Sequence, residues 1–159
     1  MTTRPRPGIR HMCLSVLSVL LLLSGACAQA RGMEDLEPAP TAQSELSAAR
    51  ELLRQERWPA AVSELQALSR RRPDDAEVHN LLGYALRKTG ALEPAFAAYR
   101  TALRLNPGHL GAHEYIGEAY LMAGRPDLAR QHLDTLRGLC GVDCEAYRDL
   151  ADAIGRHGR

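Results

Sequence analysis

Large and small apolar residues recur along this chain with a period of 34 residues, from residue 42 to residue 143. The middle period shows the pattern most clearly: Leu82-Gly83 lies in its first half, Ala95 and Tyr99 lie in its second half, and Pro107 lies near its end. Each period also carries a turn signal near its middle. A repeat of this length is typical of stacked helix-turn-helix units. The predicted units are residues 42–75, 76–109 and 110–143.

A further amphipathic segment follows the third unit, at residues 144–156. Tyr147, Leu150 and Ile154 keep the apolar register of a unit's first helix, while charged residues occupy the other side. Stacked units leave the apolar surface of the last one uncovered, and a helix with a polar outer face covers it. We therefore predict a capping helix here and seven helices in total.

The positions of Leu82-Gly83, Ala95, Tyr99, Ala102 and Pro107 resemble those of the tetratricopeptide repeat. The resemblance covers most of the chain and implies an all-α fold, an α-solenoid of three repeats closed by the capping helix. It also implies a scaffold that binds a segment of a partner protein in a concave groove. The first helix of each repeat lines this groove in the family, and neither catalysis nor a cofactor is implied.

Carrying the family's groove positions onto this chain gives residues in all three repeats. Those expected to contact a partner are Arg50, Asn80, Tyr84, Arg87, Glu114 and Glu118. The groove is thus predicted to be basic in its first two repeats and acidic in the third, which suits an extended peptide or a helix of another protein. Some relatives clamp a peptide's C-terminal carboxylate in this groove. Glu114 and Glu118 would repel a carboxylate, so we do not expect that mode of binding here.

Residues 1–30 have the composition of a secretory signal peptide. Three arginines precede an apolar run at residues 12–23, which is shorter than the roughly 20 residues needed to span a bilayer. Ala28-Gln29-Ala30 matches a cleavage site, and lipid attachment at Cys27 is the alternative route of processing. We predict an exported protein of a bacterial periplasm, either soluble or tethered by lipid. The mature chain would consist of a linker at residues 31–41 and a repeat domain at residues 42–159.

The charge of the mature chain argues against a nucleic-acid partner. Three of the 20 Lys and Arg residues lie in residues 1–30, so 17 basic residues face 19 acidic ones and the net charge is −2 with His neutral. Nucleic-acid-binding domains carry a basic excess instead. The sequence has no phosphate-binding loop, dinucleotide fingerprint, zinc-protease motif or serine-hydrolase motif. We predict a protein or peptide partner and no enzymatic activity.

Cys140 and Cys144 are the two cysteines of the mature chain. An even number of cysteines in an exported protein favours a structural disulfide. A redox-active pair and a metal site that recruits His109 or His113 are alternatives, which would make the protein a periplasmic thiol-redox or metal-handling accessory. The segment at residues 139–147 also resembles the ending of small exported proteobacterial proteins of the tetratricopeptide repeat family.

Three more expectations concern packing. His79 and His113 occupy equivalent positions and are expected to be partly buried packing residues rather than ligands. Asp74 or Asp75 is expected to cap the helix that follows, and Thr41 to cap the first helix. Gly83 is expected to allow close helix approach, so that a larger side chain there would overpack the interior.

Overall fold

The computed structural model describes residues 42–158 of the chain. The predicted signal peptide at residues 1–30, the linker at 31–41, the capping residue Thr41 and the lipid-attachment residue Cys27 lie outside the described residues.

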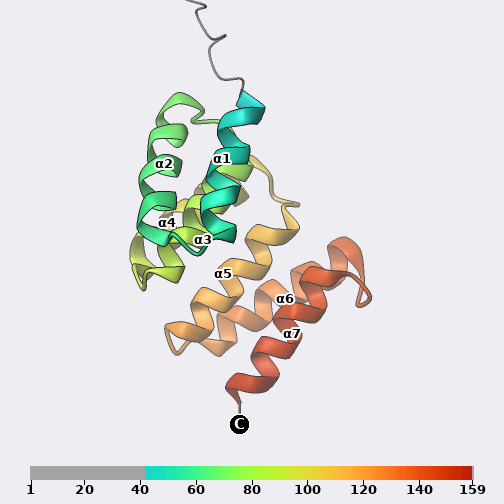
Figure 1. Ribbon diagram of the computed structural model, residues 1–159. Helices are drawn as coiled ribbons and strands as arrows, with labels where there is room; N and C mark the ends of the chain where they lie inside the picture. The colour runs from blue at the N-terminus through green and yellow to red at the C-terminus, as the bar shows by residue number, and fades with distance from the viewer. Residues whose placement is uncertain (1–41, 159) are drawn as a thin grey trace, which may run out of the picture. The chain divides into compact units, whose positions relative to one another are not determined.

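Residues 42–158 form seven α-helices and no strand (Figure 1). The helices are α1 (Ala42–Arg54), α2 (Trp58–Arg71), α3 (Ala76–Lys88), α4 (Leu92–Leu105), α5 (Leu110–Met122), α6 (Pro126–Cys140) and α7 (Glu145–His157). Helices α1, α3 and α5 each have 13 residues and begin at the first residues of the three predicted units. The all-α solenoid with a final capping helix is therefore confirmed. Within residues 42–158, no helix is both long and apolar enough to cross a membrane.

Side chains at the unit boundaries fix where α3 and α5 begin. The Asp75 carboxylate accepts hydrogen bonds from the backbone N–H groups of Glu77 (3.0 Å) and Val78 (3.2 Å), as expected of an N-cap. His109 holds the equivalent position before α5, where its Nδ1 accepts from the backbone N–H of Ala112 at 3.2 Å. The aspartate cap was expected from the sequence, whereas the histidine cap was not. Each inter-unit loop therefore ends on a side chain that satisfies the next helix.

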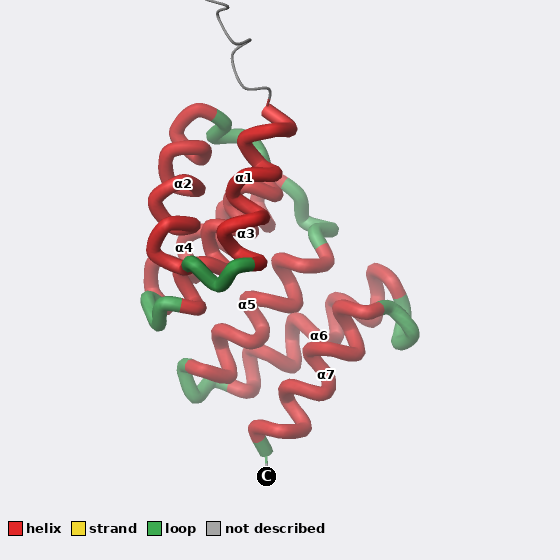
Figure 2. Tube along the Cα trace, viewed as in Figure 1, coloured by secondary structure: helices red, strands yellow, loops and turns green. Residues whose placement is uncertain are grey.

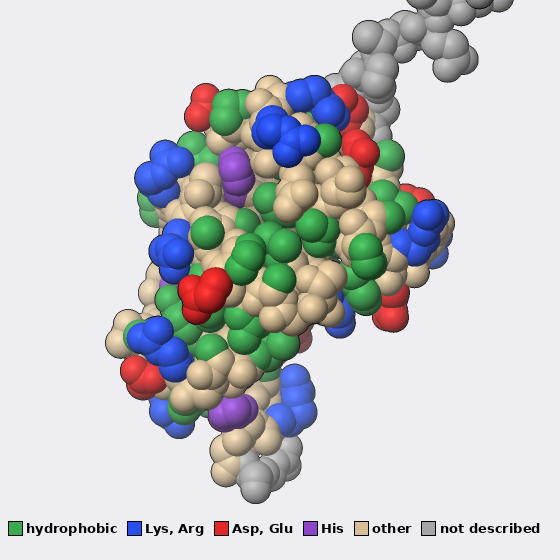
Figure 3. All heavy atoms as spheres, turned by 90° about the vertical axis from the view of Figure 1, so that its left-hand side faces the viewer, with side chains coloured by type: hydrophobic (Ala, Val, Ile, Leu, Met, Phe, Trp, Pro, Cys, Tyr) green, Lys and Arg blue, Asp and Glu red, His purple; other side chains and the backbone are tan. Residues whose placement is uncertain are grey.

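The helices lie in two layers (Figure 2). Helices α1, α3, α5 and α7 form a continuous inner layer in which each helix contacts the next. Helices α2, α4 and α6 pack against that layer, and no contact joins α2 to α4 or α4 to α6 in the described chain. Viewed from the side on which α2 and α4 lie, hydrophobic side chains cover the middle of the surface and Lys and Arg lie around them (Figure 3). Because each helix of the inner layer contacts the next, this layer brings residues of neighbouring units together.

Glycine allows the closest approaches between helices. A Cβ atom added to Gly83 would lie 2.6 Å from Cδ1 and Cε1 of Tyr99, a fully buried residue of α4. A Cβ atom added to Gly117 would lie 2.6 Å from Cδ2 of Leu150 on α7. Because real Cβ atoms essentially never lie so close to other atoms, a larger residue at either position would require the neighbouring side chain to shift. The capping helix thus packs on α5 much as α4 packs on α3.

The outer side of α7 is polar, as a capping helix requires. Leu150 is fully buried, whereas Arg148, Asp149, Asp152 and Arg156 are exposed. The apolar side of α7 joins Leu136 of α6 in a small core of its own. The predicted capping role is therefore confirmed.

Candidate functional site

The inner layer carries the candidate binding groove, and its charges vary along the helices as well as between repeats. Glu45, Glu77 and Glu145 lie in the first turns of α1, α3 and α7. Basic residues lie in the last turns of the same helices, where they interact favourably with the negative end of the helix dipole. Ion pairs between repeats neutralise much of this charge. The expected division into two basic repeats and one acidic repeat is therefore too simple.

Glu77 is the centre of the first ion-pair cluster. Its Oε1 lies 2.8 Å from Arg50 Nη2, and its Oε2 lies 3.1 Å from His109 Nε2 and 3.3 Å from Asn80 Nδ2. Burial raises the pKa of Glu77, but the hydrogen bonds from His109, Arg50 and Asn80 outweigh that effect and lower the pKa to about 2. Glu77 is therefore charged and fully engaged within the protein.

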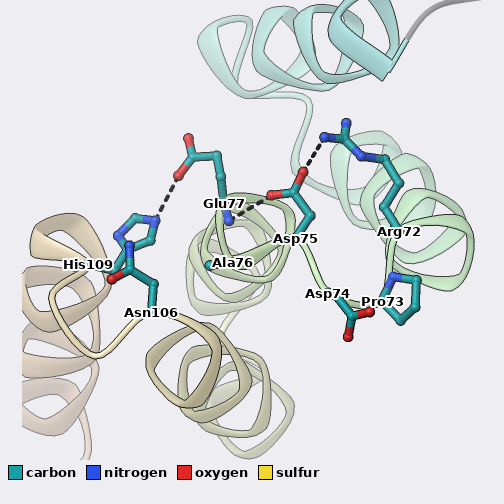
Figure 4. Close-up of a pocket in the computed structure, with 8 residues that line it drawn as sticks. All are labelled: Arg72, Pro73, Asp74, Asp75, Ala76, Glu77, Asn106 and His109. Atoms are coloured by element: carbon teal, nitrogen blue, oxygen red, sulfur yellow. Dashed lines mark hydrogen bonds and ion pairs between the residues drawn. The ribbon is translucent and has the colours of Figure 1, made fainter.

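A cleft of about 560 Å³ lies beside this cluster (Figure 4). Arg72 and Asp75 form an ion pair on one side of it, and the His109 imidazole points toward Glu77 on the other. The polar groups that Figure 4 joins by dashed lines already bond to one another. The polar contacts along this cleft hold the ends of neighbouring helices together.

Arg87 is the centre of the second cluster. Its Nη2 lies 2.6 Å from Oε2 of Glu118, and the residue is only 9% exposed. The guanidinium carbon lies over the rings of Tyr84 and Tyr115, at 5.3 Å and 5.8 Å from their centroids. The Nε atom is buried and has no hydrogen-bond partner. Arg87 therefore serves chiefly to tie α3 to α5, and it leaves one donor unused.

A row of aromatic rings lies next to Arg87 and runs from Trp58 at the start of α2 to Tyr84 on α3 and Tyr115 on α5. The ring centroids of Trp58 and Tyr84 are 5.9 Å apart, and those of Tyr84 and Tyr115 are 5.0 Å apart. All three side chains are partly exposed. Partly exposed aromatic side chains offer large apolar contacts together with polar edges, which suits them to partner binding.

The structure divides the predicted groove residues into two kinds. Asn80 and Arg87 are only 3% and 9% exposed, so their contacts are mainly with other residues of the protein. Arg50 is exposed, and Tyr84, Glu114 and Glu118 are partly exposed. The fold brings Arg50 together with Asn80 through Glu77, and Arg87 together with Tyr84 and Glu118. Contact of these residues with a partner stays a prediction.

A third feature, the acidic cleft, lies between α5 and α7 and has a volume of about 320 Å³. Its carboxylates are Glu114, Glu145 and Asp149. Burial, together with the charges of Glu118, Asp149 and Glu145, outweighs the opposite effect of Arg87 and raises the pKa of Glu114 to about 7. Glu114 was expected at this surface from the repeat positions, whereas Glu145 and Asp149 were not, because only the packing of α7 on α5 brings them there.

Cys140 ends α6, and Cys144 immediately precedes α7. Their Sγ atoms lie 1.94 Å apart and their Cα atoms 5.8 Å apart, so the fold brings the two cysteines together. Cys144 also lines the acidic cleft. A disulfide between them in the purified protein stays a prediction.

The histidines considered as metal ligands have other partners. His113 Nε2 lies 2.9 Å from the carbonyl oxygen of Pro107, and its Nδ1 lies 2.9 Å from Nδ1 of His132. His79 makes the equivalent contact with the Pro73 carbonyl at 2.8 Å. The packing role expected for His79 and His113 is confirmed. Residues 42–158 contain no group of three His, Cys, Asp or Glu side chains that could hold a metal ion.

Comparison with known proteins agrees with the architecture. Two family models described as tetratricopeptide repeat match residues 46–109 and residues 86–154. A comparison with curated proteins gave no match.

Several solved structures share the fold. The chain is 20% identical to the TPR2B domain of yeast Sti1, solved as a pHsp70 complex, with a TM-score of 0.66 over 74% of this chain and 95% of that one. It is 17% identical to SycD, the type III secretion translocator chaperone of Yersinia enterocolitica, with a TM-score of 0.65 over 76% and 90% of the two chains. It is 24% identical to MamA of Desulfovibrio magneticus, with a TM-score of 0.58 over 61% of this chain and 55% of that one.

Proposed function

Since the chain belongs to the tetratricopeptide repeat family, we propose that it is a protein-interaction scaffold that binds a segment of a partner protein in the groove of its inner layer. The observation that carries the proposal is the partly exposed row of Trp58, Tyr84 and Tyr115. Rigid aromatic side chains bind a partner at a low cost in conformational entropy. The row crosses α3 and α5 at the centre of the array, where a bound segment would contact more than one repeat.

Structures of the same fold support this role. The TPR2B domain of Sti1 was solved in a pHsp70 complex, and the first TPR of Spaghetti (RPAP3) was solved bound to the HSP90 peptide SRMEEVD. We do not transfer those ligands to this chain. Arg50 and Arg87, the basic groove residues of the first two repeats, already pair with Glu77 and Glu118, which leaves little attraction for an acidic peptide.

The test is an affinity purification from the cells that make the protein. The full chain should recover a stoichiometric partner, and Tyr84→Ala or Arg50→Glu should reduce that recovery. Arg100→Glu is the matched control, because Arg100 is an exposed residue of α4 in the outer layer. Thermal unfolding of each variant separates lost binding from lost folding. Recovery that is the same for all three variants would contradict groove binding.

The proposed location is the periplasm, reached by the signal peptide at residues 1–30. Mass spectrometry of the mature protein tests this proposal. Cleavage after Ala30 leaves Arg31 as the first residue, whereas the lipoprotein route leaves Cys27 with attached acyl chains. Purified protein that still begins at Met1 would contradict both routes of processing.

A further inference from the structure

The third repeat contains a contact between two histidines that the second repeat lacks. His113 of α5 is 8% exposed, and its Nδ1 lies 2.9 Å from Nδ1 of His132 on α6. In the second repeat His79 takes the place of His113, but the residue 34 positions before His132 is Ala98. The packing of α6 on α5 therefore includes two titratable rings, whereas the packing of α4 on α3 does not.

The hydrogen bonds of this pair determine which nitrogen of each ring carries a hydrogen. The carbonyl oxygen of Pro107 lies 2.9 Å from Nε2 of His113 and can only accept, so Nε2 donates to it. A neutral His113 then has a bare Nδ1, and the Nδ1–H group of His132 donates to that atom. With both rings neutral, every contact in this chain of groups joins one donor to one acceptor.

An added proton is unfavourable at either ring. His113 could take it only at Nδ1, which would place two N–H groups against each other at 2.9 Å and break the contact. His132 could take it at Nε2, but the charged ring would then be partly buried, with its centroid 5.7 Å from that of Tyr120. Burial, and then the charge of His113, lowers the pKa of His132 to about 4.

The surrounding helices supply no anion that would offset such a charge. Within residues 42–158 no Asp or Glu forms a hydrogen bond or ion pair with either ring of the pair. Phe96 of α4 stacks on the Tyr120 ring at 4.6 Å, and the cation Arg125 lies over the same ring at 5.5 Å. The α7 carboxylates that line the acidic cleft are not among the groups that shift the pKa of the α6 histidine. A buried charge without a partner destabilises the packing that buries it.

We propose that the His113–His132 pair is a proton-sensitive contact, which holds α6 on α5 while both rings are neutral and releases it when a proton enters the pair. The folded-state pKa of His132 lies below its ordinary value of 6.5, so the stability that depends on the neutral ring is fully present above pH 6.5 and is lost as the pH falls toward about 4. Release of α6 would also disturb α7, which packs against both α5 and α6. The inference does not depend on which partner the groove binds.

The experiment compares the hydrogen exchange of α6 amides in the full chain at pH 7 and pH 5, corrected for the intrinsic exchange rates. The opening of α6 should increase about tenfold at pH 5, while that of α4 should change less than about twofold. His132→Asn keeps an N–H donor close to His113 without the titration, and it should abolish the pH dependence of α6. His157→Asn is the matched control, because His157 is an exposed histidine at the end of α7. Comparison of variants at the same pH cancels the titration of other groups, Glu114 included.

Nitrogen-15 NMR of the imidazole rings tests the pair without any substitution. Above pH 7 His113 should be in the Nε2–H form and His132 in the Nδ1–H form, and the His132 ring should titrate well below pH 6.5. An Nε2–H form of His132 would overturn the proposal. So would α6 exchange that is the same at both pH values, or a pH dependence that persists in His132→Asn.

Discussion

Arg87 Nη2 lies 2.6 Å from Glu118 Oε2, and this ion pair joins the first helices of the second and third repeats across 31 residues of sequence. Only 11% of the Arg87 side chain and 25% of the Glu118 side chain are exposed. The aromatic rings of Tyr84 and Tyr115 flank the guanidinium and limit the access of water to it. The pair thus stabilises the packing of α3 against α5 within the groove.

Removing the anion of this pair is expected to destabilise the fold. Glu118→Gln leaves the Arg87 charge desolvated without its partner, and we expect a loss of about 2 kcal/mol in the free energy of unfolding. The control is Asp134→Asn, which breaks an exposed pair with Arg137 and should have little effect. Urea denaturation monitored by circular dichroism measures both. Equal effects of the two variants would contradict the structural role of the Arg87–Glu118 pair.

Gly83→Ala is expected to destabilise the second repeat. The added methyl group would lie 2.6 Å from the ring of Tyr99, which is fully buried, so we expect a cost of about 1–3 kcal/mol from overpacking. Gly138→Ala is the matched control, because Gly138 lies within α6 with no atom near its Cβ position. That variant should be neutral or should stabilise the protein by up to about 1 kcal/mol. If the thermal unfolding midpoints of Gly83→Ala and Gly138→Ala fell by the same amount, the close approach of Gly83 to Tyr99 would not explain the loss of stability.

The stability of the free protein is expected to depend on the protonation of Glu114. Its pKa is raised to about 7 in the folded state from 4.5, so the folded state binds the proton more tightly. Protonation of Glu114 therefore contributes to the free energy of unfolding. This contribution is fully present below pH 4.5 and is lost as the pH rises through about 7. Since the group is partly solvated, we expect a contribution of about 1–2 kcal/mol.

Glu114→Gln tests this dependence by removing the charge and keeping the shape. The variant should be more stable than the unaltered protein at pH 8 and equally stable near pH 4.5. Denaturation curves across that range measure the difference, with Asp152→Asn as the control for a general change in net charge. A difference that does not grow with pH would contradict the assigned titration.

Breaking the link between Cys140 and Cys144 is expected to loosen α7. The cysteines lie between α6 and the capping helix, and a disulfide closing so short a loop stabilises by about 2 kcal/mol in the chain-entropy account. Protein freshly purified without reductant should show no titratable thiol, and Cys140→Ser with Cys144→Ser should lower the unfolding midpoint. Two free thiols in that material would contradict the structural disulfide.

The sequence alone determined the helices, their order and the register of the repeats. These features depend on local periodicity and on turn residues such as Gly90 and Gly124, whose φ values are positive in the structure. The position of Gly83 within the 34-residue period was enough to identify it as a site of close approach. Local patterns of this kind survive into the folded state because each helix must bury the same face.

The tertiary structure alone decided which charges are free. Arg50 and Glu77 lie 27 residues apart in sequence, and Glu114 and Asp149 lie 35 apart, so no local pattern shows that the first pair neutralises itself while the second pair repels. Stacking of the inner helices brings these residues together, and burial then sets the strength of each interaction. The acidic cleft exists only because α7 packs against α5.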